Sequence, residues 1–311
     1  INSDITITSS SKYTDATSRT FLTGTKNWTI NDNGEATTVT GVISSDTTWT
    51  VANSPYTISG NVNVVSGVTL TVDPGVTVNF NSGFYLQVEG TLSAVGTLSD
   101  SIVFTGTNWK GIDIQAAGSA IKYARINGAK NGSYSVKLKG SEVSNSHIYD
   151  SRGLYLTDNS TLNKNKIHDI HSGFLQINQA GTTDSSTAYG NKFYNYLNDM
   201  DYAINLSGTG GNNGSSIVFN NNDLELKSLN NNNYHYGIYT NGINTTIEKN
   251  KIIFVDNSNN NNQNSSSSGL YIGKHYNTND TNTVVVRYNN IGGFDTNVSL
   301  SGSIPKFSNN N

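Results

Sequence analysis

Two aspartates and two histidines could perform acid–base chemistry if the fold brings them together. Asp150 and Asp169 each stand two residues after an isoleucine that recurs in successive sequence repeats. If those repeats stack as neighbouring strands, the two carboxylates lie about 5 Å apart, near the separation used by retaining glycosidases. His147 and His168 belong to the same repeats and could act as acid, base or metal ligand. The alternative is a solvated carboxylate pair flanked by surface histidines.

A further acidic pair, Asp199 and Asp201, alternates about Met200 and would share one face of a strand. Calcium binding is one interpretation of this pair, and an ordinary loop turn is the other. We expect no other cofactor. The chain has no cysteine, which excludes a disulfide framework, a zinc–thiolate site and a cysteine nucleophile.

Tyrosines form the main candidate binding surface. In strands that begin with a small residue, the side chain two places later is expected to point outward, which aligns Tyr155, Leu175, Asn205, Tyr239 and Tyr271 in one column. The expected glycan-contacting residues are Tyr149, Tyr155, Tyr194, Tyr202, Tyr236, Tyr239 and Tyr271. Tyrosine rings on a flat sheet can stack against the apolar faces of pyranose rings. Alternatively, these tyrosines only pack against neighbouring loops, because tyrosine is a favoured strand residue.

The composition favours an all-β protein. Only 13% of the 311 residues are charged and the net charge is −3, which excludes nucleic-acid binding through a basic patch. The hydrophobic fraction is 34%, and the rest is rich in Asn, Ser, Thr and Gly, which are poor helix formers. A membrane span needs about 18 consecutive apolar residues, and the sequence has no such run and no signal-peptide pattern at its start.

A repeated unit predicts how these residues are positioned. A polar residue, usually Asn, stands two places before an apolar residue at Ser146–Ile148, Asn165–Ile167, Asn191–Phe193, Asn222–Leu224, Asn250–Ile252 and Asn289–Ile291. A second short alternating strand follows each unit. This pattern is typical of a solenoid, in which the apolar residues stack into a core and each Asn, in left-handed geometry at a corner, bonds to the Asn of the next coil.

The repeats also predict the domain organisation. Residues 1–50 are Thr-rich and lack the repeat, so we expect a β-rich cap that covers the end of the solenoid. Residues 51–311 are expected to form the parallel β-helix, in which the polar runs form long loops that project between coils.

Particular residues carry a family resemblance. The runs Ser45–Thr50, Gly67–Val76, Gly90–Thr97 and Trp109–Ile112, followed by the Asn-x-Ile units, resemble secreted right-handed parallel β-helix proteins of the pectate-lyase-like superfamily. Among its members, the size, the Asn/Thr/Tyr-rich composition and the lack of cysteine are similar to the tāpirins, which are cellulose-binding adhesins. The resemblance implies a polysaccharide partner and an extracellular or cell-surface location, as part of a larger surface protein.

Two functions follow from the sequence. We expect a non-catalytic adhesin that binds an insoluble, cellulose-like plant polysaccharide through exposed tyrosines. The alternative is a secreted polysaccharide lyase or glycoside hydrolase that uses Asp150, Asp169, His147 and His168. Two observations weigh against this alternative. The sequence lacks the N-T-D, D-D and G-H-G motifs found in pectin hydrolases of the superfamily that it resembles. It also has only four arginines, the residues that bind uronic carboxylates in a bidentate manner.

Overall fold

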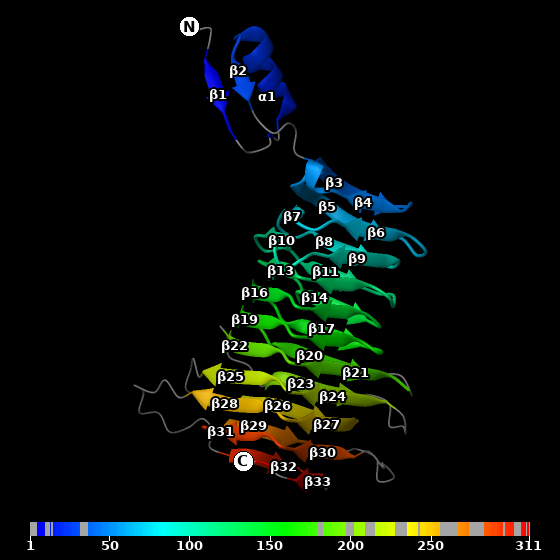
Figure 1. Cartoon of the computed structure of the whole chain (residues 1–311), viewed down its shortest axis with the longest axis vertical. Helices are drawn as coiled ribbons and strands as arrows, with labels where there is room; N and C mark the ends of the chain where they lie inside the picture. The colour runs from blue at the N-terminus through cyan, green and yellow to red at the C-terminus, as the bar shows by residue number, and fades with distance from the viewer. Residues whose placement is uncertain are drawn as a thin grey trace.

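The chain winds into a parallel β-helix whose coils stack along the long axis of the molecule (Figure 1). The structure is a computed structural model that describes residues 5–9, 13, 15–31, 37–179, 183–196, 202–208, 215–227, 235–241, 243–255, 267–273, 283–294, 296–301, 306–308 and 310. Every strand pairing in it is parallel, as when a solenoid coil stacks on the next. The prediction of an all-β parallel β-helix is therefore confirmed.

Each regular coil contributes one strand to each of three faces. The first face consists of β7 (Thr77–Phe80), β10 (Ile102–Gly106), β13 (Ala124–Asn127), β16 (His147–Ser151), β19 (Lys166–Ile170), β22 (Lys192–Tyr196), β25 (Asp223–Lys227), β28 (Lys251–Val255) and β31 (Asn290–Gly292). The second face consists of β8 (Tyr85–Val88), β11 (Gly111–Ile114), β14 (Val136–Lys139), β17 (Leu154–Thr157), β20 (Leu175–Gln179), β23 (Tyr202–Gly208), β26 (His235–Asn241), β29 (Ser267–Ile272) and β32 (Thr296–Leu300). The third face consists of β4 (Thr47–Trp49), β6 (Thr69–Val72), β9 (Thr91–Val95), β12 (Ala120–Lys122), β15 (Glu142–Ser144), β18 (Thr161–Asn163), β21 (Ser185–Tyr189), β24 (Ser216–Asn220), β27 (Asn244–Glu248), β30 (Val284–Arg287) and β33 (Lys306–Ser308).

The N-terminal part contains two kinds of structure. Strands β1 (Thr6–Thr8) and β2 (Thr29–Asn31) pair with each other, and the short helices α1 (Ala16–Thr20) and η1 (Phe21–Thr25) lie between them in sequence. In contrast, β3 (Thr37–Ile43) pairs with β5 (Tyr56–Val64), and β4 pairs with β6, with η2 (Val51–Asn53) between β4 and β5. The described strands from β3 onward thus belong to the sheets of the β-helix, and the boundary at residue 50 stays a prediction.

The core is a set of stacked apolar columns inside the coils. The apolar residues of the six repeat units, Ile148, Ile167, Phe193, Leu224, Ile252 and Ile291, are all at most 5% exposed. Because strand side chains alternate in direction, the residues on either side of each of them face outward. The predicted core column is confirmed, and it fixes which positions of the first face are available for binding.

A ladder of buried asparagines runs beside this core. The peptide N–H of Asn165 donates to Oδ1 of Asn191 at 2.9 Å, and the same bond links Asn191 to Asn222 and Asn222 to Asn250. The predicted asparagine ladder is therefore confirmed. The residue with left-handed backbone geometry, however, is the one immediately before each ladder asparagine, such as Lys164, with φ 54°, before Asn165. The asparagine itself needs ordinary backbone geometry because its amide must point along the stack.

Candidate functional site

The strand register decides which tyrosines share a column on the second face. Tyr155 aligns with Gln176, Gln176 with Asn205, Asn205 with Tyr239, and Tyr239 with Tyr271. The expectation that Leu175 belongs to this column is wrong. Leu175 aligns with Leu154 and is 1% exposed, because the turn before β20 holds the additional buried residue Phe174. Two amide side chains therefore separate Tyr155 from Tyr239.

The tyrosines beyond this gap pack against one another. The rings of Tyr239 and Tyr271 stack with centroids 5.4 Å apart and planes 6° apart, and Tyr202 lies 5.0 Å from Tyr239. Tyr236 lies 4.7 Å from Tyr271. All four are partly buried. A ring whose face is covered by a neighbour cannot stack on a sugar with that face, so this cluster differs from an array of fully exposed rings.

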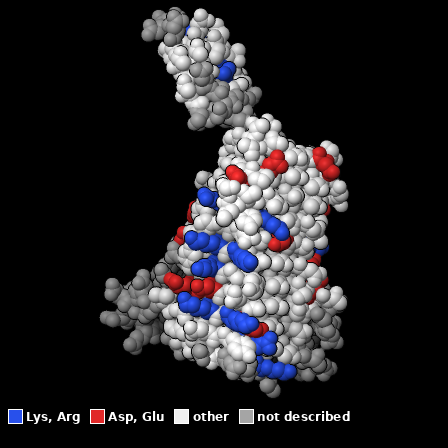
Figure 2. Space-filling view, viewed as in Figure 1, with Lys and Arg blue, Asp and Glu red and all other residues white. Residues whose placement is uncertain are grey.

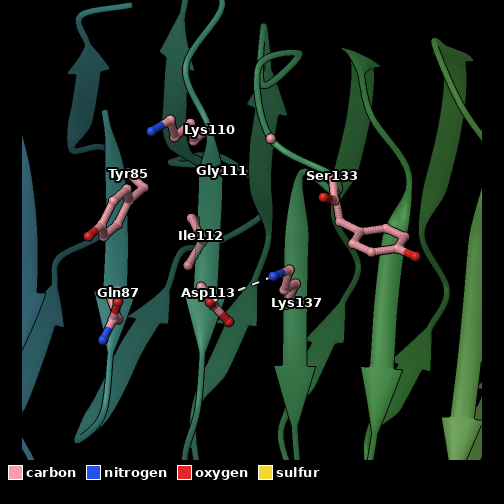
Figure 3. A pocket seen from close by; sticks show the side chains of 10 residues that line it. Tyr85, Gln87, Lys110, Gly111, Ile112, Asp113, Ser133 and Lys137 are labelled. Atoms are coloured by element: carbon pink, nitrogen blue, oxygen red, sulfur yellow. Dashed lines mark ion pairs between the residues drawn. The ribbon is translucent and has the colours of Figure 1, made fainter. Parts of the chain in front are cut away.

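Two adjoining hollows lie next to the Tyr155–Gln176–Asn205 column. The first has a volume of about 250 Å³ and is lined by Tyr85, Gln87, Lys110, Gly111, Ile112, Asp113, Gly132, Ser133, Tyr134 and Lys137 (Figure 3). The second has a volume of about 310 Å³ and is lined by Ser133, Tyr134, Arg152, Ser172, Gly173, Leu175, Gln176, Tyr202 and Asn205. They share the lining residues Ser133 and Tyr134 and therefore adjoin each other on the second face, and we call the two hollows together the groove.

Tyr134 stands at the centre of this groove and is held from two sides. Its hydroxyl donates a hydrogen bond to Oε1 of Gln176 at 2.6 Å, and its ring lies 5.0 Å from that of Tyr155. Burial, with a smaller contribution from Tyr155, raises the pKa of the Tyr134 hydroxyl. The hydroxyl therefore stays a protonated donor at neutral pH. Tyr134 and the amide of Gln176 both line the second hollow.

Charged side chains border the first hollow. Nζ of Lys137 lies 3.8 Å from a carboxylate oxygen of Asp113, and this ion pair crosses between β14 and β11 (Figure 3). Nζ of Lys110 lies 5.9 Å from the centre of the Tyr85 ring. The side chain of Lys137 is 41% exposed, so the pair is screened by water and a hydroxyl-rich ligand can reach it.

The other two predicted tyrosines lie on a different face. Tyr149 and Tyr194 belong to the first face, where the ring of His168 lies between them at 5.7 Å and 4.7 Å. Next to this stack the register places Arg125, His147, Lys166 and Lys192 in one column. Figure 2 shows Lys and Arg side chains gathered over the middle and lower coils in that view. The seven predicted tyrosines thus divide between two surfaces.

The candidate acid–base residues occupy adjacent strands of the first face, as the repeats predicted. Nδ1 of His168 lies 2.7 Å from a carboxylate oxygen of Asp169, and the rings of His147 and His168 are 4.7 Å apart. Burial, then the neighbouring His168 and Lys166, lower the pKa of His147 to about 4. His147 is therefore neutral at pH 7.

Asp150 belongs to a separate cluster of the same face. Its carboxylate accepts hydrogen bonds from Nζ of Lys130 at 2.8 Å and from His171 at 2.9 Å. Burial alone would raise the pKa of Asp150, but these two hydrogen bonds outweigh it and the pKa is lowered. A general acid for glycoside hydrolysis needs a raised pKa, so Asp150 has the character of an ion-paired carboxylate.

The calcium prediction cannot be followed in the structure. Asp199 and Asp201 lie outside the described residues. Within the part of the chain that is described, no group of three or more His, Cys, Asp or Glu side chains is arranged to hold a metal ion. The described residues also contain no helix long and apolar enough to cross a membrane.

Sequence reasoning missed the groove. Tyr134, Arg152 and Lys110 all stand in turns between the first and second faces, outside the strand pattern from which outward residues were inferred. The rung formed by β13, β14 and β15 has no Asn-x-Ile unit. Its alternation at Val136 and Leu138 is the signal that could have revealed it, because both are buried residues of the strand that begins two residues after Tyr134.

Comparison with known proteins leaves the family open. No protein-family profile matches the sequence. A stretch of 63 residues, 20% of this chain, is 40% identical to Protein bark beetle of Drosophila melanogaster, and it covers 2% of that protein. The crystal structure of the Dettilon tailspike protein overlaps 93% of this chain and 66% of its own, at 12% identity and a TM-score of 0.26. The chain is a parallel β-helix protein; nothing finer is shown.

Proposed function

We propose that the protein is a non-catalytic, extracellular polysaccharide-binding β-helix whose glycan site is the groove on the second face. The observation that carries this proposal is the hollow between Tyr134 and Tyr202, which has Gln176 and Asn205 among its lining residues. Aromatic rings suit the apolar faces of pyranoses, and side-chain amides both donate to and accept from sugar hydroxyls. The adhesin role, similar to that of the tāpirins, and the cell-surface location belong to the same proposal.

A regular glycan suits the spacing of this face. Neighbouring rungs are about 4.8 Å apart, so residues two rungs apart are separated by about 10 Å, close to the length of a disaccharide. Tyr155 and Asn205 are two rungs apart in the column, and Gln176 lies between them. In a β-linked, cellulose-like chain lying along the column, the disaccharide repeat would match the spacing of two rungs, so every second sugar would meet the protein in the same way. We therefore propose cellulose as the ligand, ahead of xylan and pectin.

A pull-down on insoluble glycans tests this proposal. The purified chain is incubated with crystalline cellulose, xylan and pectin, and the supernatants are assayed for reducing ends and unsaturated sugars. Retention on cellulose without released sugar is expected. Retention on pectin alone would contradict the proposed neutral ligand, cellulose, and indicate an acidic polysaccharide instead. Released product would instead make the protein a lyase or hydrolase, with Asp150, Asp169, His147 and His168 as the residues to mutate.

Variants locate the binding face. Tyr134→Ala and Tyr202→Ala should each weaken retention about tenfold, which corresponds to ~1.4 kcal/mol of binding free energy. The double variant Tyr239→Ala/Tyr271→Ala should also weaken it. The matched control is Tyr189→Ala, since Tyr189 is 40% exposed on the third face. Equal retention of Tyr134→Ala and the control would exclude the groove, and a loss confined to Tyr149→Ala or Tyr194→Ala would move the site to the first face.

A further inference from the structure

The first face carries a pair of imidazoles that the proposed glycan site does not use. His147 on β16 and His168 on β19 stand on adjacent rungs, and their Nε2 atoms face each other 2.5 Å apart. At this separation the two ring nitrogens share one proton in a short hydrogen bond. An ion that replaced this proton would be held by both nitrogens. From this pair and the groups around it we infer a binding site for one borderline transition-metal ion, Zn²⁺, Cu²⁺ or Ni²⁺.

The carboxylate of Asp169 sets the ring tautomer that a metal requires. It lies 2.7 Å from Nδ1 of His168, and an ionised carboxylate can only accept, so Nδ1 carries the proton. The Nε2 atom of His168 then directs its lone pair at Nε2 of His147, where it accepts the shared proton. A carboxylate behind a ligating histidine is a common second layer of metal sites, where it orients the ring and raises its basicity. Asp169 reaches this position through a left-handed backbone, with φ 53°.

Aromatic neighbours hold the rings in place. The planes of Tyr149 and Tyr194 are 13° and 15° from that of His168, on rungs before and after it. Tyr149 also lies 4.6 Å from the ring of His147. Little side-chain freedom remains to be lost when a metal binds, which favours affinity. Because the side chain of His168 is still 14% exposed, an ion can reach it from solvent.

The geometry requires only a small opening of the pair. Zinc–nitrogen bonds of about 2.0–2.1 Å at tetrahedral angles place two ligand nitrogens roughly 3.3 Å apart. The rings must therefore separate by less than ~1 Å, which small side-chain rotations can supply. The pair provides two protein ligands, and water would complete the shell. Imidazole ligands favour Zn²⁺, Cu²⁺ and Ni²⁺ over Ca²⁺ and Mg²⁺, which prefer oxygen.

Neighbouring charges act in both directions. Lys166 and Arg125 stand near His147 and oppose the arrival of a cation, whereas Asp169 favours it. The nearby Asp150 is already bonded to Lys130 and His171. The third histidine of this region, His171, is thus engaged on a separate carboxylate. His171 therefore provides a matched control, a histidine close in sequence to His168 that is not a proposed metal ligand.

Titration of the untagged full chain tests the site. Competition with a metallochromic indicator should show one Zn²⁺, Cu²⁺ or Ni²⁺ bound per chain and no competition by Ca²⁺. His147→Gln and His168→Gln should each weaken binding at least tenfold, Asp169→Asn about 10- to 100-fold, and His171→Gln less than twofold. Circular dichroism of each variant confirms that it is folded. The inference would be overturned if the wild-type protein bound no metal, or if His147→Gln and His168→Gln bound it as tightly as the wild type does.

Spectroscopy of the copper complex separates ligation from a structural role. The electron paramagnetic resonance spectrum of the wild-type Cu²⁺ complex should show coupling to two imidazole nitrogens. Either histidine variant should reduce that number to one. Coupling that is unchanged in His168→Gln would place the metal elsewhere in the chain and refute the assignment.

Discussion

Replacing Asn222 with alanine tests whether the buried asparagine ladder holds the coils together. Oδ1 of Asn222 accepts from the peptide N–H and the side-chain amide of Asn191, at 2.9 Å and 3.0 Å. Its Nδ2 donates to the carbonyl of Ala188 at 2.9 Å and to Oδ1 of Asn250 at 3.1 Å. Asn222 is 2% exposed, so water cannot easily replace these partners. Alanine removes all four hydrogen bonds at once.

The expected loss follows from these four bonds. At about 1 kcal/mol net for each hydrogen bond, Asn222→Ala should lower the free energy of unfolding by about 4 kcal/mol. Leaving the buried Asn191 N–H without this partner pushes the cost upward, because an unsatisfied buried donor costs about 1–3 kcal/mol. Asn222→Asp should be comparably harmful although its size is unchanged, since it loses both donors and sets a carboxylate against the Asn250 oxygen.

Urea unfolding followed by far-ultraviolet circular dichroism measures this loss. The midpoint of Asn222→Ala should fall with little change in slope. The control is Asn131→Ala, an exposed position where a change within about 0.5 kcal/mol is expected. If the midpoint of Asn222→Ala falls no further than that of the control, the ladder contributes no net stability and the reasoning from hydrogen bonds is refuted.

Two further predictions concern a turn and an ion pair. Gly128 has φ 76°, and a Cβ there would lie against the carbonyl oxygen of Gly106 in the preceding coil. Gly128→Ala should therefore lower the melting temperature well beyond Gly118→Ala, because Gly118 has a similar φ of 94° but no atom near the added Cβ. Equal losses in the two variants would contradict this. Hydrogen bonds from Lys249 and Arg287 lower the pKa of Glu248 below its ordinary 4.5. The ionised carboxylate therefore stabilises the folded state fully above pH 4.5, and this contribution is lost as the pH falls through the folded-state pKa. Glu248→Gln should therefore melt lower than wild type at pH 7 and approach it near pH 3, and a difference independent of pH in thermal melts would count against the pair.

The sequence was informative wherever local pattern sets structure. Each Asn-x-apolar unit places its apolar side chain inward by strand alternation alone, and Ile148 and Ile167 are buried as expected. The third face was not recognised because some of its strands, for example Thr161–Asn163, have only three residues, too few to show a period of two by themselves. The left-handed residue was misplaced by one position because many residue types occupy it, including Lys164 and Tyr288.

The sequence by itself determined a solenoid with an asparagine ladder, because both depend on residues within one short repeat. Only the tertiary structure decided which side chains meet across coils. The additional residue Phe174 in one turn places Gln176 rather than Leu175 between Tyr155 and Asn205. Contacts between rungs depend on turn lengths and strand register, which vary from coil to coil. For the same reason the Tyr134 groove, and the direct contact between the two histidines that the repeats had already grouped, His147 and His168, emerged only once the coils were stacked.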